Sequence, residues 1–285
     1  MRSHGQSWIR EGRLLGGGSR LRYRVGDMLC RSESAELHAL ADEFERPLVL
    51  KCYCGETSQG EPAQAGWQRE VGLLRRIHHP RVIGLRDSFV IQGQGCLVLE
   101  RADGDLESWL RQRGPLAEGE GRELARQLLE GLHAIHSAGV LHLDLSPANV
   151  LVRQGGLGSP FPEFLIGDFG IGALREEDLL LSRPPDHWAH LPPELIGVRP
   201  TRPTPRCDLY GLGITLLHAR LGRLPLANDR PLEEVERQVL AGVFRQEAER
   251  MDTPLGRLLA CLLQGQPEHR PASALEAWRL LLRLN

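Results

Sequence analysis

The spacing of hydrophobic positions changes near residue 100 and divides the chain into two differently patterned parts. In the first part apolar residues alternate or cluster over runs of strand length, and only Trp67, Val71, Leu74 and Ile77 recur at helical spacing. The stretch 55–66 before that helix is rich in Gly, Gln and Ser, which is typical of a connecting loop. The pattern therefore predicts one helix and five strands, at residues 21–29, 35–40, 46–53, 85–90 and 96–100.

In the second part the apolar spacing is mainly helical. One helix is marked by Leu124, Leu128, Leu132 and Ile135, and four more are expected over residues 208–221, 231–242, 255–264 and 272–283. Two short runs, Val150–Arg153 and Phe164–Gly167, predict strands. We therefore expect an α+β fold with two lobes: a five-stranded N-lobe with one helix over 21–100, and a mainly helical C-lobe over 106–283.

Residues 1–20 carry four arginines and one acidic residue. We interpret them as a flexible basic arm, with an organelle transit peptide as the alternative. The whole chain has a formal net charge of -2, which gives no electrostatic reason to expect a nucleic-acid or membrane-surface partner. No apolar run approaches the ~20 residues that a membrane span needs.

Six cysteines are scattered through the chain without the paired spacing of a metal site. Their scatter favours a reducing compartment, so we expect a cytoplasmic protein. A near-absence of lysine beside abundant Arg, Leu, Gly and Ala is typical of a GC-rich genome. It would also suit an effector that is secreted into a host cell and avoids ubiquitination, which is the second interpretation.

Lys51 is the single lysine in a chain with 34 arginines, and it ends an apolar run that predicts a buried strand. Arginine meets nearly every other cationic need of this chain. A lysine is retained where a compact point charge on a thin stem is required, and binding nucleotide phosphates is such a task. Lys51 is therefore the first candidate for a phosphate-binding residue.

Polar residues gather around the two strands predicted in the second part. His142, Asp144, Ser146 and Asn149 lie within eight residues before the first strand, and Asp168-Phe-Gly follows the second. Mg²⁺ takes oxygen ligands, usually one or two carboxylates together with substrate phosphates, and Asn149 with Asp168 offers such a set. Asp144 is then available to orient an acceptor hydroxyl.

These fragments, in this order and spacing, resemble the eukaryotic-type protein kinase family from about residue 21 to 283. The resemblance implies a bilobal kinase fold, ATP and Mg²⁺ as cofactors, and phosphotransfer to a Ser or Thr hydroxyl of a protein substrate. It implies that Lys51 holds the α- and β-phosphates and pairs with Glu70. It also implies that Asp144 is the catalytic base, with Asn149 and Asp168 as metal ligands.

Further roles follow from the same resemblance. Leu99 would be the gatekeeper, Glu194 in Pro192-Pro193-Glu194 would pair with Arg270, and Asp208 would begin the helix that anchors the catalytic loop. The nucleotide would be lined by Leu29, Leu37, Val49, Glu100, Ala102, Asp105 and Leu151, with Asp105 directed to the ribose.

The sequence departs from the family at several positions. At the three positions of the glycine-rich loop it has Cys30, Ser32 and Ala35, with Glu33 near the tip, and this restricts backbone approach to phosphates. Ser146 stands where the family has a lysine that neutralises the transferred phosphoryl group, a loss of the kind that costs about 10²–10³ in rate. Val49 replaces the usual alanine above the adenine. His187 and His190 replace the usual threonine and tyrosine.

Regulation by activation-loop phosphorylation is not expected. Leu143 replaces the arginine that would receive such a phosphate, and the segment 171–191 holds one Ser and no Thr or Tyr. An active enzyme would then be constitutive or controlled by a regulatory protein partner. Three interpretations compete: an atypical active Ser/Thr protein kinase, a pseudokinase acting as a nucleotide-binding scaffold, and a small-molecule phosphotransferase.

Overall fold

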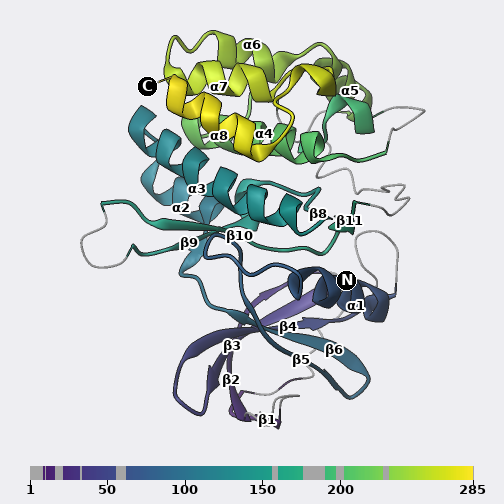
Figure 1. Ribbon diagram of the computed structural model, residues 1–285. Helices are drawn as coiled ribbons and strands as arrows, with labels where there is room; N and C mark the ends of the chain where they lie inside the picture. Colours follow the sequence, from purple (N-terminus) through teal and green to yellow (C-terminus); the bar gives the residue numbers. More distant parts are fainter. Residues whose placement is uncertain are drawn as a thin grey trace. The chain divides into compact units, whose positions relative to one another are not determined.

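The computed structural model describes residues 9, 11–16, 22–32, 34–55, 62–155, 160–175, 190–196, 202–226 and 231–284. The chain divides into two compact units, one formed by residues 1–75 with 84–101 and the other by 76–83 with 102–285 (Figure 1). The first is a sheet with one helix and the second is mainly helical. The predicted α+β class, with a strand-rich N-lobe and a helical C-lobe, is confirmed.

The sheet of the first unit has six antiparallel strands rather than five, in the order β1-β2-β3-β4-β6-β5. The five predicted strands are present, with ends that differ by a few residues. The strands are β1 (Leu14–Gly16), β2 (Arg22–Arg31), β3 (Ala35–Asp42), β4 (Pro47–Tyr53), β5 (Leu85–Ile91) and β6 (Gln94–Glu100).

The additional strand β1 lies inside the range 1–20, for which the sequence predicted a flexible arm. It pairs with β2, and Leu15 and Ile9 are both buried against the sheet. Two isolated apolar side chains among glycines give no periodic signal, which is why the strand was missed. Residues 1–8, 10 and 17–20 of that predicted arm lie outside the described part of the chain.

The two faces of the sheet have different tasks. One face carries a hydrophobic core that includes Leu40, Leu50 and Val98, with Ile9 and Leu15 over it. Side chains alternate between the faces of a strand, so the opposite face of β4 presents Val49, Lys51 and Tyr53. Directly opposite residues share a face, and Lys51 is therefore flanked by Leu37 on β3 and Leu97 on β6.

Helix α1 (Ala63–Leu74) packs against β6 and β4 on the Lys51 face. Its Trp67 donates from Nε1 to the carbonyl of Cys96 at 3.1 Å. The Trp67 ring lies on Gly95, where a Cβ atom would overlap it, so a glycine is required there. The helix begins within the stretch 55–66 that was predicted as a loop. Of that stretch, residues 56–61 lie outside the described part.

The second unit contains seven helices among the described residues. Leu124, Leu128, Leu132 and Ile135, which predicted the longest helix, are all fully buried. The helices are α2 (Leu106–Arg113), α3 (Glu118–Ser137), α4 (Pro205–Leu221), α5 (Leu232–Leu240), α6 (Val243–Glu249), α7 (Pro254–Leu262) and α8 (Ala274–Arg283). The single helix predicted over 231–242 ends at Leu240. Gly242 has φ of 74° and begins a separate helix, α6, that was not predicted.

The strands of the second unit are short. Strands β9 (Val150–Arg153) and β10 (Glu163–Ile166) form the predicted antiparallel pair, and β7 (Gly104–Asp105) adds to β9. A two-stranded pair of β8 (Val140–Leu141) with β11 (Ala173–Leu174) follows the end of α3. These strands surround the segment 142–149 and the segment 167–172, in which the candidate polar residues lie.

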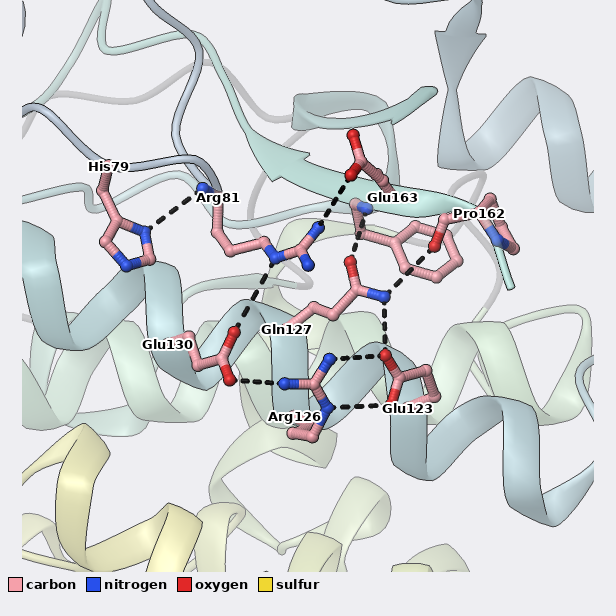
Figure 2. Close-up of polar contacts among 9 residues, drawn as sticks. His79, Arg81, Glu123, Arg126, Gln127, Glu130, Pro162 and Glu163 are labelled. Atoms are coloured by element: carbon pink, nitrogen blue, oxygen red, sulfur yellow. Dashed lines mark hydrogen bonds and ion pairs between the residues drawn. The ribbon is translucent and has the colours of Figure 1, made fainter. Parts of the chain in front are cut away.

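Residues 76–83 follow α1 along the chain but belong to the second unit. Backbone hydrogen bonds join this segment to β10: Ile166 donates to Arg81 at 2.8 Å, and Ile83 donates to Ile166 at 2.9 Å. The Arg81 guanidinium lies between Glu130 of α3, at 3.7 Å, and Glu163 of β10, at 3.9 Å (Figure 2). The segment is therefore attached to both a helix and a strand of the second unit.

Gln127 extends this polar network into the hairpin. Its Oε1 accepts from the Phe164 amide at 2.8 Å, and its Nε2 donates to Glu123 at 2.8 Å and to the Pro162 carbonyl at 3.1 Å (Figure 2). Arg126 holds Glu123 through two hydrogen bonds and also contacts Glu130. The start of β10 is thus fixed on α3 by side chains as well as by packing.

A buried ion pair fixes the start of α4. The Arg270 guanidinium donates to both carboxylate oxygens of Glu194 at 2.7 Å, and also to the carbonyls of Gln264 and Arg206. The Cys207 thiol donates to the same carboxylate at 3.3 Å. Burial, and next the charge of Glu194, raise the pKa of the Cys207 thiol to about 12, so it stays a neutral donor.

Among the described residues, no helix combines the length and apolar composition needed to cross a bilayer.

Replacing Arg270 by Met should lower the free energy of unfolding by about 3–5 kcal/mol, because the buried Glu194 carboxylate would lose the guanidinium that donates to both of its oxygens. The matched control is Arg257→Met. Arg257 lies 3.7 Å from Asp252 with both side chains exposed, so its loss should cost no more than about 1 kcal/mol. Urea unfolding of both variants measures the difference. Equal losses would show that the Arg270 pair contributes no more than a surface contact.

Candidate active site

Lys51 and Glu70 meet in the first unit. The Lys51 ammonium donates to Glu70 Oε2 at 2.9 Å, and the two side chains are 9% and 1% exposed. Lys51 is held by its register in the middle of the sheet, and Glu70 by the docking of α1 through Trp67. This buried contact joins helix α1 to strand β4.

Tyr53 joins this pair, although the sequence did not single it out. Its hydroxyl donates to the same Glu70 Oε2, and its ring lies 5.3 Å from the Lys51 ammonium. Tyr53 is two residues after Lys51 on β4, so the strand alternation alone was enough to place it on the same face.

The other predicted nucleotide-lining residues of this unit lie on or near that face. Leu37 stands opposite Lys51, and Val49 stands opposite Leu99. Leu29 is 45% exposed on β2. The Glu100 carboxylate contacts Arg86 of the neighbouring strand, while its backbone amide donates to Gly84 at 3.0 Å.

The connection between β2 and β3 is closed by a serine in place of glycine. The Ser32 hydroxyl accepts from the Ala35 amide at 3.0 Å, and the Ser32 amide donates to the Ala35 carbonyl at 2.9 Å. The Ala35 amide is therefore engaged inside the turn. Cys30 is exposed, and Glu33, which the sequence placed near the tip, lies outside the described part.

In the second unit the loop 142–149 is held by Asp208, at the start of α4. One oxygen of this buried carboxylate accepts from the Leu143 amide at 2.7 Å. The other accepts from the His142 amide at 2.9 Å and lies 2.8 Å from His136 Nε2. Leu143 has φ of 64°, a conformation that costs energy in a residue with a side chain. The hydrogen bonds from the His142 and Leu143 amides to Asp208 hold the Leu143 backbone in this conformation.

His142 links this loop to the segment after β10. Its Nε2 lies 2.9 Å from the carbonyl of Gly167, and its Nδ1 accepts from the Asp144 amide at 3.2 Å. The two bonds require the tautomer with a proton on Nε2. The imidazole also packs edge-on against the buried ring of Phe169, at 4.9 Å between centroids. His142 therefore has a structural role here.

Asp144, Asn149 and Asp168 are brought together by these contacts and by the β9–β10 hairpin. Asn149 comes directly before β9, and its carbonyl accepts from the Gly167 amide at 2.9 Å, one residue before Asp168. The Asn149 Nδ2 donates to Asp144 Oδ2 at 3.0 Å and to the Asp144 carbonyl at 2.8 Å. A carboxylate, a carboxamide and a second carboxylate thus lie on adjoining loops.

The donor set fits Mg²⁺ bound together with phosphates. The Asn149 amide group turns its nitrogen toward Asp144, which leaves its oxygen for a hard cation. Asp168 is exposed, has φ of 56°, and accepts from the Gly170 amide at 3.0 Å. In the described part of the chain, no three His, Cys, Asp or Glu side chains are grouped to hold a metal by themselves. A cation here would need ligands from a bound molecule.

Three predicted nucleotide-lining residues belong to the second unit: Ala102, Asp105 and Leu151. Asp105 is the N-cap of α2, where its two oxygens accept from the amide and hydroxyl of Ser108 at 2.7 and 3.0 Å. Capping the helix is a sufficient structural reason for an aspartate at position 105. The contact of Asp105 with a ribose remains a prediction. Leu151 lies opposite Asp105 in the register of β7 with β9.

A small cavity of about 10 Å³ lies beside Asp144. Polar and apolar atoms contribute about equally to its wall. The residues around it are Leu143, Asp144, Leu145, His190, Pro192, Leu195, Cys207, Asp208 and Gly211. His187, which the sequence placed in this region, is outside the described residues.

Residues 38–279 match the family model described as the protein kinase domain. This chain belongs to the protein kinase family. The match includes Lys51, Glu70, Asp144, Asn149 and Asp168, and it covers both units.

The names of similar curated proteins agree with this assignment. The kinase domain is 31% identical over 243 residues to the serine/threonine-protein kinase PkaA of Streptomyces coelicolor, covering 82% of this chain and 42% of that protein. It is 30% identical to the probable serine/threonine-protein kinase PknB of Lactococcus lactis, over 73% of this chain and 33% of that protein. It is also 30% identical to the CBL-interacting protein kinase 29 of Oryza sativa, over 79% and 51%. The chain thus spans between a third and about half of these relatives' lengths.

The pH dependence of stability should report on Asp208. Burial alone would raise the pKa of its carboxyl, but the hydrogen bond and charge of His136, with the charge and amide of His142, hold it below the ordinary 3.8. The folded state therefore favours the carboxylate form of Asp208. This preference stabilises the kinase domain at pH values above the pKa that Asp208 has in the unfolded chain. That contribution is lost as the pH falls through the lower folded pKa.

We expect Asp208→Asn to lower the free energy of unfolding by about 3 kcal/mol at neutral pH. The difference from the wild type should begin to shrink as the pH falls below about 4, where the unfolded carboxyl takes up a proton, and should continue to shrink as the pH falls through the lower folded pKa of Asp208. Asp103→Asn, at an exposed carboxylate that caps the Gln154 amide at 2.7 Å, is the control. Denaturant unfolding across the pH range measures both. A difference that does not change with pH would rule out a role for the Asp208 charge.

Proposed function

We propose that this kinase domain transfers the γ-phosphoryl group of Mg²⁺-bound ATP to a Ser or Thr hydroxyl of a protein. The observation that carries the proposal is the joint fixing of Asp144, Asn149 and Asp168 by the Asn149 amide and the Gly167 amide. Three polar groups gathered beside apolar strands call for a common explanation, and a shared catalytic site provides one. The Ser/Thr kinase names of the relatives support the same acceptor class.

Each residue then has one task. Asp144 orients the acceptor hydroxyl and takes its proton, while the acceptor oxygen bonds to the γ-phosphorus and the bond to the bridging oxygen of ADP breaks. Asn149 and Asp168 hold Mg²⁺, which supplies neutralisation of the phosphate charge when bound. Lys51, oriented by Glu70, binds the phosphates of the nucleotide.

The proposed enzyme is slow and is not controlled by activation-loop phosphorylation. Ser146, which is buried at the start of the short helix Pro147–Asn149, brings no positive charge where the family has a lysine. Leu143 brings none to a phosphate on the segment that follows Asp168. Control by a regulatory protein partner, or constitutive activity, follows from that absence. We also propose a cytoplasmic location, on the evidence of the six unpaired thiols.

A pseudokinase that binds nucleotide without transferring phosphate is the second candidate. The Ser32 turn favours it, because the Ala35 amide is already engaged and the loop offers fewer donors to a phosphate. A small-molecule phosphotransferase is less well supported. The Glu194–Arg270 pair and the Asp208 anchor are the features that the sequence took as typical of protein kinases, and both contacts are formed.

Two substitutions separate catalysis from binding. Asp144→Asn should leave Mg²⁺-dependent ATP binding nearly intact and reduce phosphotransfer by a factor of about 10² or more, because proton acceptance acts in the transition state. Asp168→Asn should instead lose the Mg²⁺ dependence of binding. Thermal shift with and without Mg²⁺-ATP measures binding, and radiolabelled transfer to a generic protein acceptor measures activity.

The wild type decides between the two leading candidates. Binding without transfer above the Asp144→Asn background, with every acceptor tested, would replace the active enzyme by the pseudokinase. A wild type that shows no shift at millimolar nucleotide would contradict both. Asp103→Asn, at an exposed carboxylate remote in sequence from the loop, should match the wild type in each assay.

Lys51→Arg should damage nucleotide binding almost as much as Lys51→Met. The planar guanidinium is broader than an ammonium, and Lys51 is buried beside Leu37, Leu97 and Glu70. Titration of Mg²⁺-ATP by thermal shift gives the dissociation constant for each variant. An arginine variant with wild-type affinity would show that the single lysine of this chain has no special task.

A further inference from the structure

We propose that Tyr53 is a positioning residue that fixes the Glu70 carboxylate, and with it helix α1, independently of Lys51. The kinetic part of this inference rests on the proposed function, whereas the structural part does not. Tyr53 lies outside the set that the sequence predicted, and it makes its contacts entirely within the first unit.

The contacts of Tyr53 converge on Glu70. Its hydroxyl and the Lys51 ammonium both donate to Glu70 Oε2. Both donors come from β4, two residues apart, whereas the acceptor comes from α1. The small Ala35 stands directly opposite Tyr53 on β3 and leaves room for the ring on this face. The carboxylate is therefore attached to the sheet at two points.

The two attachments differ in stiffness. A lysine has a flexible four-carbon stem, whereas a tyrosine has two side-chain torsions and a rigid ring. Tyr53 is only 3% exposed, so its hydroxyl has no alternative partner in bulk water if Glu70 moves away. The ring also lies 5.3 Å from the Lys51 ammonium and attracts it by a cation–π interaction. Tyr53 is thus the fixed point for both members of the ion pair.

This arrangement has a consequence for ATP binding. When Lys51 turns its donors toward phosphates, its hold on Glu70 weakens, while the bond from the Tyr53 hydroxyl stays. Helix α1 then remains in place throughout the reaction without the help of a phosphate on the activation segment. The inference explains how a kinase domain with Leu143 in place of an arginine keeps its ion pair formed.

Hydrogen exchange of the α1 amides tests the structural part. Tyr53→Phe should raise exchange in residues 66–74 about tenfold, because one hydrogen bond to a charged group is lost. Tyr23→Phe is the matched control: Tyr23 is 1% exposed in the same sheet, and its hydroxyl donates to Asp87 at 3.2 Å. That control should leave α1 exchange within about twofold of the wild type.

Lys51→Met supplies a second test, in a variant that keeps the Tyr53 hydroxyl and loses the ammonium. With Tyr53 intact, α1 exchange should rise less than about tenfold, and adding Tyr53→Phe should raise it further. A large rise in Lys51→Met, together with wild-type exchange in Tyr53→Phe, would overturn the proposal and assign the helix to the lysine alone.

Kinetics test the remaining part. In Tyr53→Phe, kcat/KM for Mg²⁺-ATP should fall about tenfold, while Tyr23→Phe, which also loses one buried hydroxyl, should change it less than about twofold. Equal effects of the two variants would reduce Tyr53 to a general contributor to stability. If the wild type transfers no phosphate, the proposed function fails, and the exchange measurements still decide the role of Tyr53.

Discussion

The candidate site of the second unit depends on one buried carboxylate. Asp208 takes the amides of His142 and Leu143 and contacts His136, so that α4, α3 and the loop before β9 meet at a single group. The strained backbone at Leu143 is held there by these bonds, and Asp144 follows directly. Without the Asp208 carboxylate, the His142 and Leu143 amides would lose their acceptor inside the protein, where water does not replace it.

The first unit is organised in the same way around Glu70. There a single carboxylate is approached by an ammonium and a hydroxyl from one strand, and the helix that carries it is seated by Trp67 on Gly95. In each unit a buried carboxylate with several donors fixes the position of one element. Asp208 fixes the loop 142–149, and Glu70 fixes helix α1. Burial makes each anion sensitive to the loss of a donor, and this sensitivity is what confers positional precision.

Sequence reasoning found the parts of the fold that have a strong period or a distinctive residue order. The five central strands, the α3 helix and the β9–β10 pair all follow from spacing, because burial of one face imposes it. Strand β1 and helices α2 and α6 were missed. Strand β1 rests on two isolated apolar residues, and α6 depends on a left-handed glycine, Gly242, inside what reads as one continuous helix. The hydrogen bond from the Gly167 amide to the Asn149 carbonyl depends on the register of the β9–β10 hairpin, which the sequence does not specify. The Ser32 turn depends on the position of the serine hydroxyl, which only the structure provides.

Under the proposed function, the Ser32 turn would also affect how long a nucleotide stays bound. A loop whose amides point at phosphates holds both the substrate and the product, and in many enzymes product release limits turnover. Because Ser32 engages the Ala35 amide within the turn, fewer hydrogen bonds would have to break when a nucleotide leaves. The serine that weakens the capture of ATP would therefore also shorten the residence of ADP. Where ATP is abundant, its concentration would offset the weaker capture, and the shorter residence of ADP would be the effect that remains.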